Sequence, residues 1–201
     1  MKTDGLGTLV PFLSTVPAVG PGWDFEVVQA LNGYERAWLQ GLSRLFSDTE
    51  TAVVIVVPLL LIAWAARSRR REWQRAALAV GLSVLAAFLI GYALKYGIGR
   101  PRPYELYPEL LRPFSLERTP SFPSGHATSS MALAVALWLN YRRRWLTALS
   151  VGWSLCVCLS RVYEGVHYPT DVAAGIVLGA AVAWAVRRLL THPGQSGRRA
   201  A

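Results

Sequence analysis

The sequence predicts an all-α protein, a polytopic bundle of membrane-spanning helices, and three observations point to this fold class. Of the 201 residues, 53% are hydrophobic and only 16% are charged, and the mean hydropathy is +0.31. The apolar residues gather in five long runs between short polar stretches. Only a backbone that satisfies its own hydrogen bonds can cross a bilayer, so these runs are expected to be helices. One membrane domain explains the chain better than soluble domains do.

The first 48 residues are predicted to form an N-terminal region of their own. The apolar run at residues 9–19 is short and contains Pro11 and Pro17, so either a sixth span or an interfacial segment fits it. It lacks the basic start and the small-residue cleavage pattern of a removable signal peptide. Residues 24–47 carry apolar side chains at helical spacing among charged ones, which predicts a helix on the membrane surface.

Residues 49–190 form the predicted membrane core. The five predicted spans, each rich in Ala, Leu and Val, are residues 51–66, 75–98, 126–141, 145–163 and 169–190. The first and third need a few flanking residues to reach the roughly 20 that a bilayer requires. The tail at residues 191–201 is rich in Gly and Arg and is predicted to be disordered.

The formal net charge of +9 comes largely from arginines beside the apolar runs, at residues 67–75, 142–144 and 187–199. This pattern is typical of membrane anchoring and not of a nucleic-acid-binding face. If the five spans alternate, all three clusters lie on one side, which the positive-inside rule makes cytoplasmic, together with the C-terminus. The connections at residues 99–125 and 164–168 then face outwards.

These outward connections and the helix end before the second one nevertheless contain arginines, at positions 100, 102, 112, 118 and 161. Nearby glutamates, at positions 105, 109, 117 and 164, offer one explanation, which is partial neutralisation. An anion-binding site is the other, and the three polar clusters described next favour it.

The first cluster pairs Lys95, near the end of a span, with Arg102 seven positions later. Gly97, Gly99 and Pro101 break the helix between them, so both cations can face one point. Arg102 offers a planar fork that matches phosphate oxygens, and Lys95 offers a compact charge. Taken alone, the pair also fits a lysine that snorkels to the membrane surface.

The second cluster, Pro123-Ser124-Gly125-His126, opens a new helix. Backbone N–H groups at a helix start bind anions, and Gly125 lets a ligand approach the backbone closely. His126 can donate a proton to a departing oxygen. Ser124 alone would equally fit a simple helix cap.

The third cluster contains Ser160-Arg161, His167 and Asp171, at the end of one span and the start of the next. A carboxylate beside an imidazole fixes its tautomer and stabilises the cation that forms when the other ring nitrogen attacks. Asp171 could instead serve only as an acid in the first turn of its helix. Ionisable groups at the border of a membrane domain are functional candidates by default.

Together the clusters supply three cations, two histidines and one orienting carboxylate, a set suited to phosphoryl transfer. The sequence shows no carboxylate or His/Cys cluster that is convincing as a metal site, so Lys95, Arg102 and Arg161 are expected to take over the electrostatic role of a metal. No cofactor is expected.

The three clusters resemble the signatures of the type 2 phosphatidic acid phosphatase superfamily, and the resemblance covers roughly residues 24–190. Those signatures read Lys, six residues, Arg-Pro; then Pro-Ser-Gly-His; then Ser-Arg, five residues, His, three residues, Asp. All three are present here in order and without a gap. The chain departs from relatives with six membrane helices at residues 9–19, where the apolar run is too short and proline-rich for a clear first span.

The resemblance implies that His167 attacks phosphorus to give a phosphohistidine, that Asp171 orients it and that His126 protonates the leaving oxygen. It further implies that the phosphate is held by Lys95, Arg102, Ser124, Gly125 and Arg161. The same superfamily contains soluble vanadium haloperoxidases, which five apolar spans and a short chain disfavour.

The expected partner is a membrane lipid phosphate in the bilayer, with undecaprenyl pyrophosphate or phosphatidylglycerol phosphate as the best candidates. The resemblance also favours a bacterial inner membrane with the site on the extracytoplasmic side. A lipid-phosphate transporter or binding protein without enzymatic activity is the alternative, and a variant at His167 separates the two classes. The sequence leaves the oligomeric state open.

Overall fold

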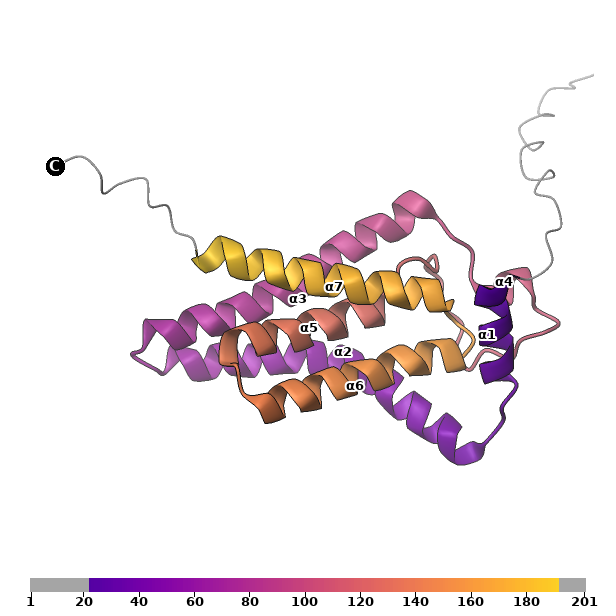
Figure 1. The fold of residues 1–201 in the computed structure, drawn as a ribbon, viewed down its shortest axis with the longest axis horizontal. Coiled ribbons are helices and arrows are strands. Elements are labelled where there is room, and N and C mark those ends of the chain that lie inside the picture. The colour runs from indigo at the N-terminus through magenta and orange to yellow at the C-terminus, as the bar shows by residue number, and fades with distance from the viewer. Residues whose placement is uncertain (1–21, 192–201) are drawn as a thin grey trace, which may run out of the picture.

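The structure, a computed structural model, describes residues 22–191, and this part of the chain is helical and contains no strand (Figure 1). The predicted segment at residues 9–19 and all but the first residue of the predicted tail lie outside it. The helices are α1 (Trp23–Asn32), α2 (Ala37–Ala66), α3 (Arg71–Ile98), α4 (Pro103–Leu106), α5 (Gly125–Tyr141), α6 (Arg144–Tyr163) and α7 (Pro169–Thr191).

The long helices run up and down beside one another, so that their ends gather at two opposite ends of the bundle (Figure 1). One end holds α1 and α4. It also holds the first residues of α2, α5 and α7 and the last residues of α3 and α6. The other end holds the α2–α3 and α5–α6 turns and the end of α7. The arginines of the α2–α3 and α5–α6 turns and those at positions 187 and 188 therefore share one end of the described part of the molecule, as the alternating topology predicted.

Four of the described helices, α2, α3, α6 and α7, are long and apolar enough to cross a membrane. They expose large apolar side chains, such as Leu59, Phe88 and Leu159, on the outside of the bundle. Such a surface is suited to contact with the lipid tails of a bilayer. The predicted count of five full spans is not confirmed. The predicted span at residues 126–141 is α5, which has 17 residues and is packed against α2, α3, α6 and α7.

Residues 24–47 differ from the single surface helix that their periodicity predicted. They form α1 and the first part of α2, separated by residues 33–36, and α2 continues without interruption past residue 48 into the apolar run. The reason lies in Ser43 and Ser47, which are buried and donate hydrogen bonds to the buried carboxyl group of Glu164. A polar inner face thus attaches this stretch to α6, while Trp38 and Leu45 remain exposed.

Glycines in α7 allow it to approach α5 very closely. A Cβ atom at Gly175 would lie 2.7 Å from the carbonyl oxygen of Ser124, and one at Gly179 would clash with that of Thr128. Small residues that let two backbones meet are typical of membrane helix pairs. The close approach places the start of α7 beside the start of α5, where the Ser124 N–H donates to the Asp171 carbonyl at 3.0 Å.

Candidate active site

The residues of the three predicted clusters come from different helix ends that meet at one end of the bundle (Figure 1). They are Lys95 in the last turn of α3, Arg102 before α4, Ser124, Gly125 and His126 at the start of α5, Arg161 near the end of α6, His167 in the α6–α7 loop and Asp171 in the first turn of α7. The structure therefore brings together segments separated by up to 76 positions in the chain.

His167 lies at the centre of this region and is 1% exposed. Its Nδ1 atom is 3.5 Å from Oδ2 of Asp171, and its Nε2 atom is 3.3 Å from Nη1 of Arg102. Burial, followed by the positive charges of Arg102, Arg161 and Lys95, holds the pKa of His167 well below its usual value of 6.5. The ring is therefore neutral at pH 7, with Nδ1 turned to a carboxylate and Nε2 turned to the cations.

Asp171 is fully buried and its carboxylate is held from three directions. It accepts a short hydrogen bond from the Ser121 hydroxyl and one of 2.9 Å from the Tyr168 N–H. Arg100 forms an ion pair with its other oxygen at 2.6 Å and a second pair, at 2.9 Å, with Asp24 of α1. Such a carboxylate has a fixed orientation, as a group that orients an imidazole must.

Arg102 is also fully buried, although it carries a charge. It donates to the carbonyl oxygens of Thr119 and Val166, at 2.7 and 2.9 Å, and its Nη2 atom is 3.4 Å from the Glu117 carboxylate. These contacts fix the guanidinium beside the His167 ring. Lys95, on the neighbouring helix, donates to the Pro120 carbonyl at 2.7 Å.

Arg161 is the third buried cation and is paired with two carboxylates. Its Nη1 atom contacts Glu164 at 2.9 Å and makes a short contact with the Ser47 hydroxyl, and its Nη2 atom makes a short contact with Glu117. Burial opposes ionisation of Glu117, but Arg161 and Arg102 outweigh it and hold the pKa of that carboxyl below its usual value. Neutralisation by glutamates, one of the two explanations of the arginines, is therefore present at Arg102 and Arg161.

Two buried polar atoms of this cluster have no hydrogen-bond partner, namely the Ser124 hydroxyl oxygen and Nε of Arg161. Unsatisfied buried polar groups are rare and call for an explanation. Both can donate to an anion, and Gly125, beside Ser124, adds a backbone N–H at the start of α5. A Cβ atom at Gly125 would meet only the Lys95 side chain, at 3.7 Å, so the α5 start and Lys95 face the same space.

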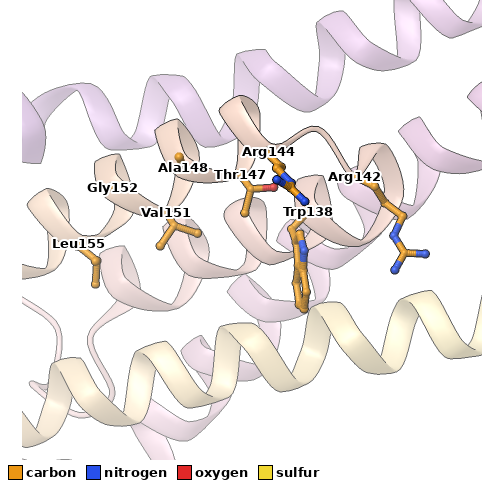
Figure 2. Close-up of a pocket in the computed structure, with 8 residues that line it drawn as sticks. All are labelled: Trp138, Arg142, Arg144, Thr147, Ala148, Val151, Gly152 and Leu155. Atoms are coloured by element: carbon orange, nitrogen blue, oxygen red, sulfur yellow. The ribbon is translucent and has the colours of Figure 1, made fainter.

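His126 occupies the side of the site that faces an apolar cavity. Its Nε2 atom is 3.8 Å from Oε2 of Glu50, a buried carboxyl group on α2. The cavity has a volume of about 580 Å³ and is lined mainly by apolar side chains of α2 and α3, with Glu50, His126 and Ser129 at one end. A larger space of about 820 Å³ lies at the other end of the bundle, between the end of α5 and α6 (Figure 2), and none of the predicted site residues lines it.

Sequence reasoning missed four residues that complete this arrangement: Arg100, Glu50, Ser121 and Ser47. The sequence did mark Arg100 as a basic residue on the wrong side for anchoring, and that signal could have found it. Glu50 directly precedes a predicted span, where it resembles an ordinary flanking charge. Within residues 22–191 no group of three or more His, Cys, Asp or Glu side chains is arranged to hold a metal ion.

The fold and the candidate site define a class of protein: a multi-pass membrane protein in which buried cations, a helix start and a carboxylate-paired histidine lie together at one end of the bundle. The comparison with known families then identifies it. The model of the PAP2 superfamily matches residues 76–193, and the chain belongs to this family. Phosphatases of this superfamily hydrolyse phosphate esters and anhydrides, and we assign the chain to this class of hydrolase.

Individual relatives agree with this membership. An undecaprenyl-diphosphatase of Sulfolobus acidocaldarius is 31% identical over 163 residues, 79% of this chain and 74% of that protein. A decaprenylphosphoryl-5-phosphoribose phosphatase of Mycobacterium tuberculosis is 38% identical over 123 residues, 61% of this chain and 64% of that protein. The crystal structure of a transmembrane phosphatidylglycerolphosphate phosphatase from Bacillus subtilis shares the fold, with a TM-score of 0.65 and 23% identity over 86% of this chain and 87% of that one.

Proposed function

We propose that the protein hydrolyses a polyprenyl diphosphate of the undecaprenyl type through a phosphohistidine intermediate, with buried cations supplying the positive charge that the reaction needs. The observation that carries the proposal is the position of His167. Its Nδ1 atom faces Asp171 at 3.5 Å, and its Nε2 atom faces Arg102 at 3.3 Å. A neutral imidazole whose free nitrogen points at a phosphate-binding cation is poised for nucleophilic attack.

In the first step, Nε2 of His167 forms a bond to phosphorus while the bond from phosphorus to the leaving oxygen breaks. Asp171 stabilises the positive charge that develops on the ring. His126 gives a proton to the leaving oxygen. In the second step His126 takes a proton from water, the water oxygen bonds to phosphorus, and the bond between phosphorus and His167 breaks to release inorganic phosphate.

Five residues hold the phosphoryl group in this proposal. Lys95, Arg102 and Arg161 balance the charge on its oxygens, as arginine and lysine do in other phosphoryl-transfer sites. The unpartnered donors of Ser124 and Arg161, with the Gly125 N–H, complete the cradle.

An apolar chain on the substrate is supported by the cavity between α2 and α3, because its apolar walls lead away from His126 towards the outside of the bundle. A lipid could keep its tail there while its phosphate reaches the cations. The two relatives with isoprenoid substrates in their names favour a polyprenyl chain over a diacylglycerol. The location that we propose is a bacterial inner membrane. The basic clusters at the opposite end support an orientation with the site on the extracytoplasmic side and the C-terminus in the cytoplasm.

Phosphate release by the purified protein in detergent tests the proposal, with undecaprenyl diphosphate, phosphatidylglycerol phosphate and phosphatidic acid as substrates and with EDTA present. We expect release to be fastest from the diphosphate, insensitive to EDTA and reduced on the order of 10⁴-fold in His167→Ala. Rapid quenching should trap an acid-labile phosphoryl label on the wild-type protein that is absent from the variant. Folded wild-type protein that releases no phosphate would favour a transporter or binding protein instead.

A further inference from the structure

Glu50 is a carboxyl group in an unusual place. It lies well inside α2, directly before an apolar stretch, and is only 3% exposed. An ionisable group in such a position is costly to bury and is normally retained because it has a partner and a function. No step of the proposed mechanism uses it so far.

Two partners of Glu50 lie on α5, the helix whose first residues are proposed to bind the phosphate. Ser129 donates a short hydrogen bond to Oε1, and Nε2 of His126 lies 3.8 Å from Oε2. His126 and Ser129 are three positions apart and therefore share one face of α5. Thr51 donates to Oε2 at 3.3 Å, which fixes the carboxyl group from its own helix.

Both histidines of the site thus have a buried carboxyl group beside one ring nitrogen. For His167 the pair is Nδ1 with Asp171, at 3.5 Å, and for His126 it is Nε2 with Glu50, at 3.8 Å. The arrangement leaves Nδ1 of His126 free for the substrate. A carboxylate at one nitrogen orients an imidazole and stabilises its protonated form.

We infer that Glu50 is a positioning residue for His126, which it holds in the orientation and protonation state needed to donate a proton to the leaving oxygen. The inference rests on the proposed function. In this role Nδ1 of His126 releases its proton as the phosphorus–oxygen bond breaks, and the ring, left neutral, stays against Glu50 until it takes a proton from water. Both residues line the end of the apolar cavity, which is the side on which a lipid leaving group would lie.

The need for Glu50 should therefore depend on the leaving group. A lipid alcohol leaves as a strongly basic alkoxide unless it is protonated, so hydrolysis of a phosphate monoester requires the acid. A lipid phosphate displaced from a diphosphate, or nitrophenolate displaced from p-nitrophenyl phosphate, is a much weaker base, and its departure depends less on a proton from His126. Glu50 would then determine how well the enzyme hydrolyses monoesters relative to diphosphates.

The test measures kcat for phosphatidic acid, undecaprenyl diphosphate and p-nitrophenyl phosphate in Glu50→Gln, Glu50→Asp and His126→Asn. Gln at position 50 keeps an oxygen that can accept the Ser129 hydrogen bond but removes the charge. Asp48→Asn, at an exposed position two residues away on α2, is the matched control. Thermal midpoints and size-exclusion profiles in detergent report whether each variant is folded.

We expect Glu50→Gln and His126→Asn to lower kcat for phosphatidic acid on the order of 10²-fold. The loss should be at least about tenfold smaller for the two substrates with weakly basic leaving groups, because these need His126 mainly to take a proton from water. Glu50→Asp should recover part of the loss, and Asp48→Asn should behave as wild type. An equal loss on all three substrates, or no loss on any, in a folded Glu50 variant would overturn the inference. Wild-type protein inactive on all three would overturn the proposed function itself, and with it the role of Glu50.

Discussion

Arg161 on α6 forms an ion pair with Glu117, a residue of the long α4–α5 connection that lies 44 positions earlier in the chain. The other oxygen of the same carboxylate is 3.4 Å from Arg102. A carboxylate thus bridges two of the three cations that are proposed to hold the substrate. In the absence of substrate it provides the negative charge that a phosphoryl group would otherwise bring, so substrate and Glu117 compete for the same donors.

Glu117→Gln should therefore bind phosphate more tightly than the wild type. Removing the competing charge is expected to lower the inhibition constant of inorganic phosphate about 3- to 10-fold, which corresponds to roughly 1 kcal/mol. Competitive inhibition of phosphate release measures it. Glu109→Gln, an exposed acid in the same connection, is the control and should leave the constant unchanged. Weaker inhibition in Glu117→Gln would mean that Glu117 positions the arginines and does not compete with the ligand.

The membrane helices were predictable because the bilayer imposes a long apolar run, and α3, α6 and α7 lie within a few residues of the expected ranges. The first part of α2 was not predictable, because alternating polar and apolar residues look the same on a membrane surface and on a bundle with a polar interior. What distinguishes the two is the contact of Ser43 and Ser47 with Glu164, which lies more than 110 positions away.

The candidate site likewise contains residues that local sequence predicts and residues that only distant contacts identify. The convergence of the three short clusters was predictable because each lies at a helix end and the alternation of spans brings the ends together. Glu50 was not, since it is a lone charge whose partner, His126, is more than 70 positions away. Arg100 carried only the signal of a basic residue on the wrong side for anchoring, and its partner Asp171 is also more than 70 positions away. Only the packing of α2 against α5, and of the α3–α4 connection against α7, reveals what they contact.

The pH dependence of kcat/KM should show how the neighbouring cations lower the pKa of His167. The neutral ring is the attacking form, so kcat/KM falls as the pH drops through the pKa of His167, and because that pKa is lowered, the fall should lie below pH 6.5. Lys95→Gln removes one of the charges that lower the pKa, which should move the acid limb to higher pH. Ionisation of the substrate affects both proteins equally and cancels in the comparison.

Arg112→Gln is the control for this measurement. Arg112 is exposed and pairs with Glu35 at 3.3 Å, away from His167, so its removal should leave the acid limb where it is in the wild type. An acid limb that stays in place or moves to lower pH in Lys95→Gln would contradict the assignment of the limb to His167.

The unpartnered hydroxyl of Ser124 predicts an unusual variant. Ser124→Ala removes no hydrogen bond from the ligand-free protein, so its thermal midpoint without phosphate should equal that of the wild type. Its affinity for inorganic phosphate should fall roughly 2- to 10-fold, the value of one hydrogen bond of about 0.5–1.5 kcal/mol. Ser130→Ala should instead lower the thermal midpoint and leave the phosphate affinity unchanged. The reason is that the Ser130 hydroxyl is hydrogen-bonded to that of Ser154 at 2.9 Å inside the bundle. Thermal shifts at increasing phosphate concentration measure both, and a Ser124→Ala protein with wild-type affinity would exclude Ser124 from the cradle.

The close approach of α7 to α5 couples helix packing to the chemistry, and Gly175→Ala tests that coupling. The added Cβ would lie 2.7 Å from the Ser124 carbonyl oxygen and 2.9 Å from the Ala127 Cβ, too close for either to remain in place. We expect a loss of about 1–3 kcal/mol of stability together with a lower kcat, because the α5 start carries Ser124 and His126. Gly152→Ala, on the outside of α6 with no atom within 4 Å of the new Cβ, should change neither. If Gly175→Ala lowered the thermal midpoint but left kcat intact, the α5–α7 contact would support the fold without setting the geometry of the site.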